Sequence, residues 1–226
     1  STRKESSAAQ MCIRDRCKEI LNKCQQYKIK SIFIGGGTPS YLEVHEIKKL
    51  LETVNKLQFV DDMEFTMECN PGTVNKEKLI AMKDGGINRI SFGLQSCNNE
   101  LLKIIGRIHT YKLARKLGFN NINVDLMYGL PNLTVDLWKD TLAKICNLKP
   151  EHISAYSLII EEGTAFYTLH MKDKLNLPSE EEEREMDKLT KDVLGSGGYH
   201  QYEISNYSLE GRECEHNKVY WKLKEY

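Results

Sequence analysis

A short apolar run passes directly into a turn of three glycines in the stretch Ile32-Phe33-Ile34-Gly35-Gly36-Gly37-Thr38-Pro39. The apolar residues predict a buried strand. Three successive glycines lack every Cβ, so the backbone after this strand is free to adopt positive φ and to approach a ligand closely. We interpret the turn as a cradle for a small anionic or zwitterionic ligand, with an ordinary glycine-rich turn as the alternative. It matches neither the GxGxxG fingerprint nor a P-loop.

Strand-like segments recur along the chain, each followed by a helical pattern. The expected strands span residues 31–34, 64–68, 89–94, 123–128 and 152–159. The expected helices between and after them span residues 44–57, 76–84, 134–146 and 180–194. A repeat of roughly 30 residues is typical of βα units. Strands that alternate with helices predict a parallel sheet with right-handed crossovers.

Polar residues occur at the C-terminal end of nearly every expected strand, and they distinguish a barrel from an open sheet. They are Thr38, Glu68, Asn70, Gln95, Asp125, Glu161 and Glu162. An open doubly wound sheet concentrates its ligand contacts after its first two strands, whereas a barrel gathers loops from all strands around one pocket. The pattern favours a partial TIM-like β/α barrel over the open sheet.

Three features refine this organisation. Ser179 and Glu182 form a capping box that begins the last expected helix, and Gly195 is expected to end it. The crossover before the fourth strand looks cramped, because a helix over 98–107 is followed by barely two turns over 111–117. Residues 1–16 show no periodicity, so we expect an unrelated or disordered segment there.

The length, the net charge and the distribution of apolar residues exclude several classes of protein. The 226 residues are enough to bury a core as one domain, and 32 basic residues balance 32 acidic ones. Nothing in this charge favours nucleic acid or an anionic membrane, and no apolar run is long enough to span a bilayer. The first residues also lack the apolar core of a signal peptide, so we expect a soluble cytoplasmic protein.

Seven cysteines occur without a secretion signal, which favours reduced thiols over a disulfide framework. Cys69, Cys97 and Cys146 lie in or beside apolar segments, and we expect them to act as small core residues.

Several polar residues are candidates for ligand contact. The carboxylate of Glu68 is suited to a ribose or an ammonium group, and Gln95 offers a donor and an acceptor. Arg107 has the fork geometry that binds carboxylates. Asp125 interrupts an apolar strand and requires a partner, protein or ligand. For Glu68 and Arg107 a solvated surface position is the alternative, and Gly93 marks close packing or ligand approach.

A histidine near the end of the chain stands beside large aromatic residues, in His216-Asn217-Lys218-Val219-Tyr220-Trp221. Such a histidine is able to ligate a haem iron that lies against the aromatic rings. A solvated loop histidine is the alternative.

The residues from about Lys30 to Trp221 resemble the oxygen-independent coproporphyrinogen oxidase group of radical S-adenosylmethionine (SAM) proteins, and within it the HemW-type haem chaperones. The resemblance is carried by the segments IFIGGGTPSYL, ECNPGT, RISFGLQS, IGRIHT, VDLMYGLP, YEISNY and HNKVYW. The last two favour the chaperone branch.

The resemblance implies a partial barrel with SAM across its top and haem bound near its end. It implies that Gly36, Gly37 and Thr38 line the methionine moiety and that His216 is an axial haem ligand. Further SAM contacts would be Glu68, Gln95, Arg107 and Asp125.

The sequence departs from this family at the start, where a first strand and a CxxxCxxC motif for a [4Fe–4S] cluster are expected. Cys12, Cys17 and Cys24 do not have that spacing, and Cys24 falls on the first expected helix. We therefore predict no cluster and no other metal site in this chain. Two helical turns are also missing between Thr110 and Tyr111 relative to the family.

By this comparison, residues 17–201 form the partial barrel without its first strand, and residues 202–226 begin a C-terminal region that continues in the family. The chain is interpreted as a fragment or a damaged gene model.

Three functions remain open. The first is a chaperone that passes haem to a cytochrome or respiratory protein, with peripheral membrane association of the parent protein. The second is an oxidase that decarboxylates coproporphyrinogen III after reductive SAM cleavage, and the third is an inactive barrel fragment.

Overall fold

The computed structural model describes residues 19, 22–24, 26–95 and 101–222, and the side chains of 95 and 101–106 are not described. Five parallel strands follow one another in the sheet. They are β1 (Ile29–Ile34), β2 (Phe59–Cys69), β3 (Arg89–Gln95), β4 (Ile122–Tyr128) and β5 (His152–Ser157). Two short strands, β6 (His200–Gln201) and β7 (Asn206–Ser208), complete the order β1-β2-β3-β4-β5-β7-β6, and β7 is antiparallel to both of its neighbours.

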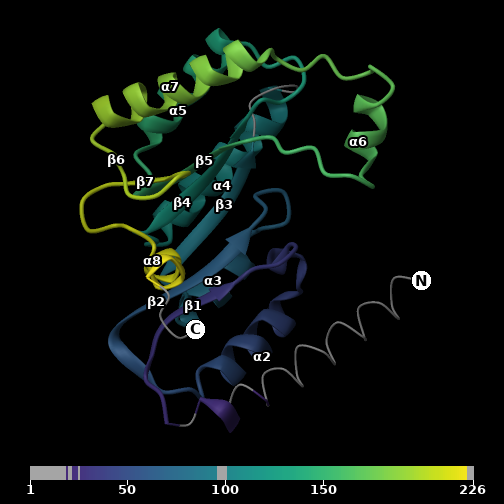
Figure 1. Ribbon diagram of the computed structural model, residues 1–226. Helices are drawn as coiled ribbons and strands as arrows, with labels where there is room; N and C mark the ends of the chain where they lie inside the picture. Colours follow the sequence, from purple (N-terminus) through teal and green to yellow (C-terminus); the bar gives the residue numbers. More distant parts are fainter. Residues whose placement is uncertain (1–18, 20–21, 25, 96–100, 223–226) are drawn as a thin grey trace.

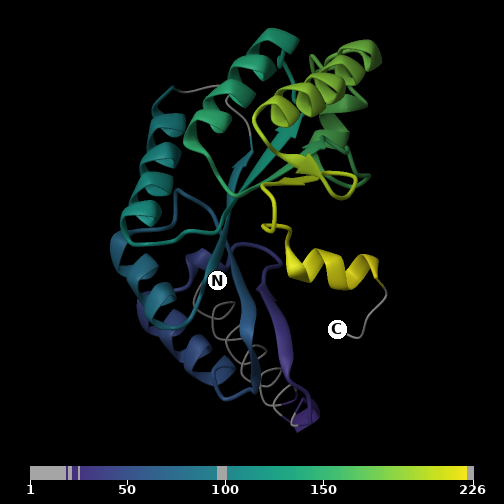
Figure 2. The same cartoon turned by 90° about the vertical axis from the view of Figure 1, so that its left-hand side faces the viewer.

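Helices α2 to α5 cover the outer side of this sheet, as Figures 1 and 2 show. The helices are the 3₁₀ turn η1 (Pro39–Tyr41), α2 (Val44–Val54), α3 (Lys76–Asp84), α4 (Leu101–Lys116), α5 (Val135–Leu148), α6 (Ala165–His170), α7 (Glu180–Ser196) and α8 (Glu215–Trp221). In Figure 2 the sheet is curled, with α2 to α5 along its outer side and α8 on the open inner side. The consecutive strand order and this curl confirm the partial barrel. Within the described residues β1 pairs on one side only, with β2.

Strands β2 to β5 present an apolar face to the helices and a polar face to the interior of the half-barrel, whereas β1 turns Phe33 inward. Side chains alternate along a strand, so residues two apart share a face. The helix-facing set is buried and includes Phe65, Met67, Ile90, Phe92, Val124, Leu126 and Ile153. The inner set includes Glu64, Thr66, Glu68, Arg89, Ser91, Asn123, Asp125, His152, Ser154 and Tyr156. Asp125 therefore belongs to a regular polar layer and does not interrupt an otherwise apolar strand.

The predicted division of the crossover before the fourth strand into two short helices is wrong. Helix α4 continues through Thr110 and Tyr111 without interruption over 16 residues. Tyr111 and Ala114 are buried against the sheet, and the Tyr111 hydroxyl donates to the carbonyl of Leu148 at 3.0 Å. Burial of this face stabilises one continuous helix where the local pattern suggested two short ones.

The last long helix, α7, begins as predicted. Ser179 and Glu182 form a reciprocal capping box at its start, but the helix continues past the predicted stop at Gly195 and has Gly197 as its C-cap. It packs on α5 through Trp138, whose Nε1 donates to Thr190 Oγ1 at 2.9 Å. A buried indole N–H needs such a partner, so this bond fixes the register between the two helices.

The segment after residue 201 joins the same sheet, because β7 pairs with β5. Both the boundary at 201 and the separate character of 1–16 stay predictions, and residues 1–16 lie outside the described part of the chain. Of the helices in the described ranges, none has the length and apolar character that crossing a bilayer requires.

Candidate functional site

The glycine turn leaves β1 with its backbone in the left-handed region. The φ angles of Gly36 and Gly37 are 84° and 111°, and the space into which a Cβ would point is open at both. Gly35 differs, because a Cβ there would lie 2.8 Å from the Phe33 ring and 2.9 Å from the Glu68 carboxyl. The expected positive φ is confirmed, and the turn exposes backbone groups where a side chain would cover them.

Glu68 closes the inner side of this turn. The backbone N–H of Gly36 donates to Glu68 Oε2 at 3.2 Å. Burial raises the pKa of the Glu68 carboxyl, the Gly36 hydrogen bond opposes the rise, and the nearby charge of Asp125 adds to it. Residues from the first, second and fourth strands therefore meet at one end of the barrel, as their positions after the strands predict.

A second layer of polar contacts holds the turn in place. Ser40 Oγ lies 2.7 Å from Thr73 Oγ1 and accepts from the backbone N–H of Asn70 at 2.9 Å. Beneath them the buried Lys78 donates to the carbonyls of Ser40 at 2.9 Å and Thr73 at 3.1 Å. An ammonium group buried in this way is stabilised only when its donors are satisfied. The loops after β1 and β2 are thus joined into one unit.

The partners that Asp125 requires are supplied by the sheet. Asn123 Nδ2 donates to Asp125 Oδ1 at 2.7 Å, and Ser91 Oγ donates to Oδ2 at 3.0 Å. Burial raises the pKa of Asp125, and hydrogen bonds from Asn123, Ser91 and Ser154 oppose the rise. Each carboxylate oxygen has room for a further donor, so intramolecular pairing and ligand contact are compatible at this residue.

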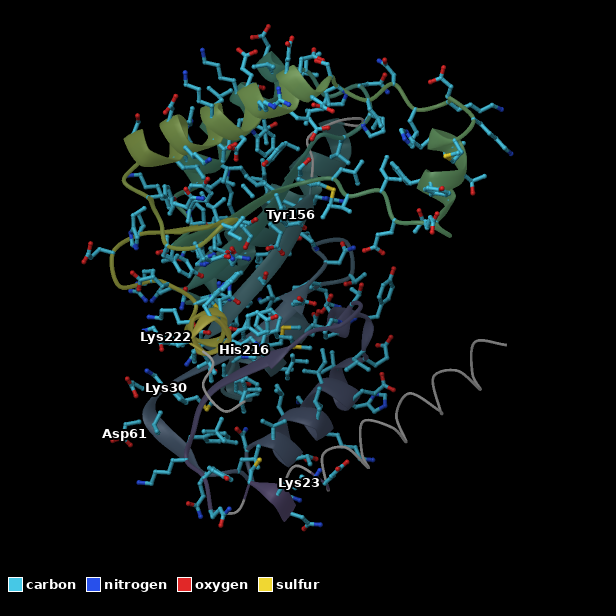
Figure 3. The ribbon with its side chains drawn as sticks, in the orientation of Figure 1. Lys23, Lys30, Asp61, Tyr156, His216 and Lys222 are labelled. Atoms are coloured by element: carbon cyan, nitrogen blue, oxygen red, sulfur yellow. The ribbon has the colours of Figure 1, made fainter. Side chains whose placement is uncertain are left out.

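Gly93, which the sequence marked for close packing or ligand approach, and Tyr156, which it did not mark, extend the site. Gly93 lies opposite Asp125 in the register, and no atom of the described residues stands within 4 Å of where its Cβ would be. Close packing against the described residues therefore does not explain a glycine at this position. Of the two interpretations made from the sequence, the close approach of a ligand remains. Tyr156 on β5, labelled in Figure 3, has a pKa raised by burial and by the charges of Asp125 and Glu68. Its position was readable from the alternation His152-Ile153-Ser154-Ala155-Tyr156, which puts it on the inner face.

The structure gives fewer side-chain contacts for Arg107, Gln95 and Thr38, the remaining SAM contacts that the resemblance implies. Arg107 lies within α4 rather than at a helix end, is half-buried, and donates to the carbonyl of Leu94 near the end of β3. Gln95 ends β3 in the same region, but its side chain lies outside the described set. Thr38 is the N-cap of η1 and accepts from the N–H of Tyr41 through its carbonyl at 2.9 Å.

A buried hydrogen-bond relay runs from Asp125 across the inner face. Asn123 Nδ2 donates to both Ser91 at 2.8 Å and Asp125, so its Oδ1 accepts from Nδ1 of His152 at 2.6 Å. The other ring nitrogen, Nε2, then accepts from the Tyr202 hydroxyl at 2.7 Å. Burial and the charge of Arg89 hold the pKa of His152 well below its ordinary value, so the ring is neutral. Sequence reasoning missed His152 because a strand histidine carries no motif.

His216 lies in the first turn of α8, on the inner side of the half-barrel (Figure 3). Its ring stacks on Phe33 of β1 with centroids 5.1 Å apart, and it is half-buried. Burial lowers the pKa of the imidazole, which favours the neutral form that binds iron. Within the described residues its ring nitrogens have no hydrogen-bond partner, while Tyr220 and Trp221 of the same helix are 60% and 54% exposed. The alternative of a solvated loop histidine does not describe the residue, because it is helical and half-buried.

The cysteines give the described part of the chain no metal site. Cys69 and Cys214 are buried free thiols, Cys24 and Cys146 are half-buried, and no three His, Cys, Asp or Glu side chains of the described residues gather around one point. Cys24 lies in a bend just past helical residues 22–23, not on the helix as expected. Cys12, Cys17 and Cys97 lie outside the described residues. The residues present fit the amino-acid end of SAM, but those described do not fit an iron–sulfur cluster.

Comparison with known proteins gives relatives over most of the chain. The protein named Heme chaperone HemW of Bacillus subtilis is 41% identical over 221 residues, which cover 92% of this chain and 58% of that relative. The protein of that name from Escherichia coli is 39% identical over 210 residues, covering 89% and 54%. Radical S-adenosyl methionine domain-containing protein 1, mitochondrial, of Danio rerio is 36% identical over 223 residues, covering 95% and 50%. The chain thus spans only half to three fifths of these relatives' length.

The solved structure of coproporphyrinogen III oxidase (HemN) from Escherichia coli, a radical SAM enzyme, superposes with a TM-score of 0.71 over 92% of this chain and 51% of that one. At 23% identity this likeness establishes the fold alone. The family model described as the radical SAM superfamily matches residues 13–145, more than half of the sequence. The chain therefore belongs to the radical SAM superfamily.

Proposed function

We propose that this protein is a haem-handling chaperone of the radical SAM type, which binds SAM at the glycine turn and haem through His216. The observation that carries the proposal is the state of His216. A half-buried imidazole in the neutral form, whose ring nitrogens meet no hydrogen-bond partner in the described part of the chain, is a suitable axial ligand, and the exposed rings of Tyr220 and Trp221 offer apolar surface to a porphyrin. The relatives named heme chaperones support the same function.

For SAM, the chain offers contacts of two kinds. The turn formed by Gly36, Gly37 and Thr38 presents backbone groups to the amino-acid end. The carboxylates of Glu68 and Asp125 accept hydrogen bonds from an ammonium or from ribose hydroxyls. Gln95 and Arg107 complete the proposed set from β3 and α4. SAM, when held at an iron–sulfur cluster, supplies radical chemistry to this superfamily, and the residues above bind and orient it.

The chaperone is preferred to an oxidase acting on coproporphyrinogen III. Relatives at 39–41% identity are named heme chaperones, whereas the likeness to the oxidase is one of fold at 23% identity. The haem acceptor is assigned to a cytochrome or another respiratory protein, reached from the cytoplasm by peripheral membrane association, on the family resemblance alone.

A titration with haem tests the function. The Soret band is expected to shift and sharpen on addition of the wild-type chain, and His216→Ala is expected to weaken binding by about tenfold or more because iron loses its axial ligand. His45→Ala, which removes an exposed histidine from α2, is the matched control and is expected to behave as wild type. An identical titration for His216→Ala and wild type would contradict the proposal.

A further inference from the structure

Helix α8, which carries His216, does not cap its own N-terminus. Its N-cap residue, Cys214, makes no side-chain capping bond. Free N–H groups in the first turn of a helix require acceptors, and a carboxylate is the strongest one available. Here the acceptor comes from Glu64 on β2, which stands 151 positions before Glu215 in the chain.

Glu64 receives three donors from the start of α8. The backbone N–H groups of Glu215 and His216 donate to its two carboxylate oxygens at 3.1 Å and 3.3 Å, and the Cys214 thiol donates at 3.3 Å. Both oxygens of the carboxylate are therefore engaged by the helix. Because peptide dipoles place partial positive charge at a helix N-terminus, this arrangement also compensates the negative charge of Glu64.

The carboxylate is buried, and so is its charged neighbour. Glu64 is 6% exposed and Arg89 is 1% exposed, with Arg89 Nε 3.9 Å from Glu64 Oε2. Among the described residues that nitrogen has no hydrogen-bond partner, while Arg89 Nη1 donates to Thr66 Oγ1 at a long 3.5 Å, so the charge of Glu64 and this weak bond hold Arg89. Separating a buried carboxylate from a buried guanidinium would leave each charge uncompensated, which costs free energy of folding. Each group therefore constrains the other to the inner face of the sheet.

Two further contacts from β1 fix the same turn of α8. The His216 ring stacks on Phe33, and Lys30 Nζ lies 2.9 Å from Glu215 Oε2. Figure 3 shows Lys30 and His216 close together at this end of the sheet. The lysine pair is largely exposed and contributes little, so the buried bonds to Glu64 provide most of the restraint on the His216 backbone.

We propose that Glu64, supported by Arg89, is the positioning residue for His216: its carboxylate binds the His216 N–H and so sets where the imidazole stands inside the half-barrel. The inference rests on the proposed function, because it concerns the residue assigned to haem. Glu64 itself does not contact the haem iron. It determines how far the imidazole is ordered before haem arrives, and preorganised ligands bind more tightly.

Hydrogen exchange of the full chain, read by mass spectrometry on the peptide containing α8, tests the restraint without haem. The double variant Glu64→Ala/Arg89→Met removes the acceptor without stranding the guanidinium. In this variant the amide hydrogens of Glu215 and His216 are expected to exchange about tenfold faster. This increase corresponds to the loss of the charge-assisted hydrogen bonds to Glu64. Exchange in β4 is expected to stay unchanged. Equal exchange of α8 in wild type and double variant would overturn the proposal.

Two single variants support this comparison. Glu64→Gln keeps the shape of the side chain and one acceptor oxygen, and an exchange rate between those of the wild type and the double variant is expected. If the double variant does not fold, this single variant tests whether Glu64 restrains α8. Asp61→Asn removes an exposed carboxylate from the same strand and serves as the control, with exchange as in wild type. Exchange of α8 that is unchanged in Glu64→Gln would overturn the proposal.

Haem titration of the same variants separates this inference from the proposed function. We expect the double variant to bind haem about tenfold more weakly, with a Soret shift that still depends on His216. If the wild type shows no His216-dependent shift, the proposed function fails while the exchange experiment still tests the restraint. If α8 exchanges faster but haem affinity is unchanged, Glu64 holds the helix without positioning the ligand, and the inference fails alone.

Discussion

The imidazole of His152 is fixed by the amide of Asn123, whose Oδ1 lies 2.6 Å from Nδ1 of the ring. Because both protons of the Asn123 amide go to Ser91 and Asp125, this contact assigns the ring proton to Nδ1. The side chain that orients Asp125 thus also orients His152. Through Tyr202, which accepts from the N–H of Cys214 at 3.2 Å, the relay reaches the start of α8. The proposed SAM and haem residues therefore rest on one hydrogen-bonded layer.

The neutral state of His152 predicts how stability depends on pH. Its folded-state pKa lies well below the ordinary value of about 6.5, so below pH 6.5 the unfolded chain binds a proton that the folded chain does not. Stability is then lost as the pH falls, by up to about 1.4 kcal/mol per pH unit from this residue. The lowered pKa of His216 acts in the same direction, and the raised pKa values of Glu68 and Asp125 act in the opposite one.

The variant His152→Gln isolates that contribution. Urea unfolding of wild type and variant between pH 5 and 7.5 is expected to give a difference in unfolding free energy that shrinks toward acid pH, because only the wild type pays the proton penalty. The other titrating groups are common to both proteins and cancel. A difference that stays constant across this range would show that the pKa of His152 is the same in the folded and the unfolded chain.

Asp125 is expected to matter more for SAM than for folding. Asp125→Ala removes the hydrogen bonds from Asn123, Ser91 and Ser154 but also a buried charge, so the free energy of unfolding is expected to fall by no more than about 1 kcal/mol. SAM affinity, measured by calorimetry, is expected to fall about tenfold because a charged acceptor is lost. Asp61→Asn on β2 is the control. A large loss of stability with unchanged SAM affinity would make Asp125 a purely structural residue.

Gly93 provides a steric probe of the same pocket. The space beside it is empty and its φ is not positive, so Gly93→Ala is expected to change the free energy of unfolding by less than about 0.5 kcal/mol. If SAM passes over β3 opposite Asp125, the added methyl group occupies its path and raises the dissociation constant several-fold. Chemical denaturation and calorimetry on the same preparation measure both quantities. Unchanged affinity would place the ligand elsewhere.

The sequence was sufficient for the barrel and for the strand-end residues that meet beside the glycine turn. Strand ends marked by Gly36, Glu68 and Asp125 could be found because glycine turns and strand-end acids leave a local signal. The interior below them could not be found in this way. Glu64 and His152 acquire their roles from α8 and Tyr202, which are far away in the chain, and no local pattern specifies such partners. The continuous helix α4 was missed for a similar reason, since burial on the sheet outweighed its local sequence pattern.

Lys78 tests whether the glycine turn depends on the layer beneath it. Lys78→Met keeps the length and the apolar stem of the side chain but leaves the carbonyls of Ser40 and Thr73 without their donor. An unsatisfied buried acceptor costs about 1–3 kcal/mol, so the free energy of unfolding is expected to fall within that range. SAM binding is expected to weaken as well, because the loop after β1 loses its anchor to the loop after β2. Lys76→Met, on the exposed side of the same helix, controls for loss of charge and is expected to leave both measurements unchanged. Weakened stability with full SAM affinity would mean that the turn holds its shape through Glu68 alone.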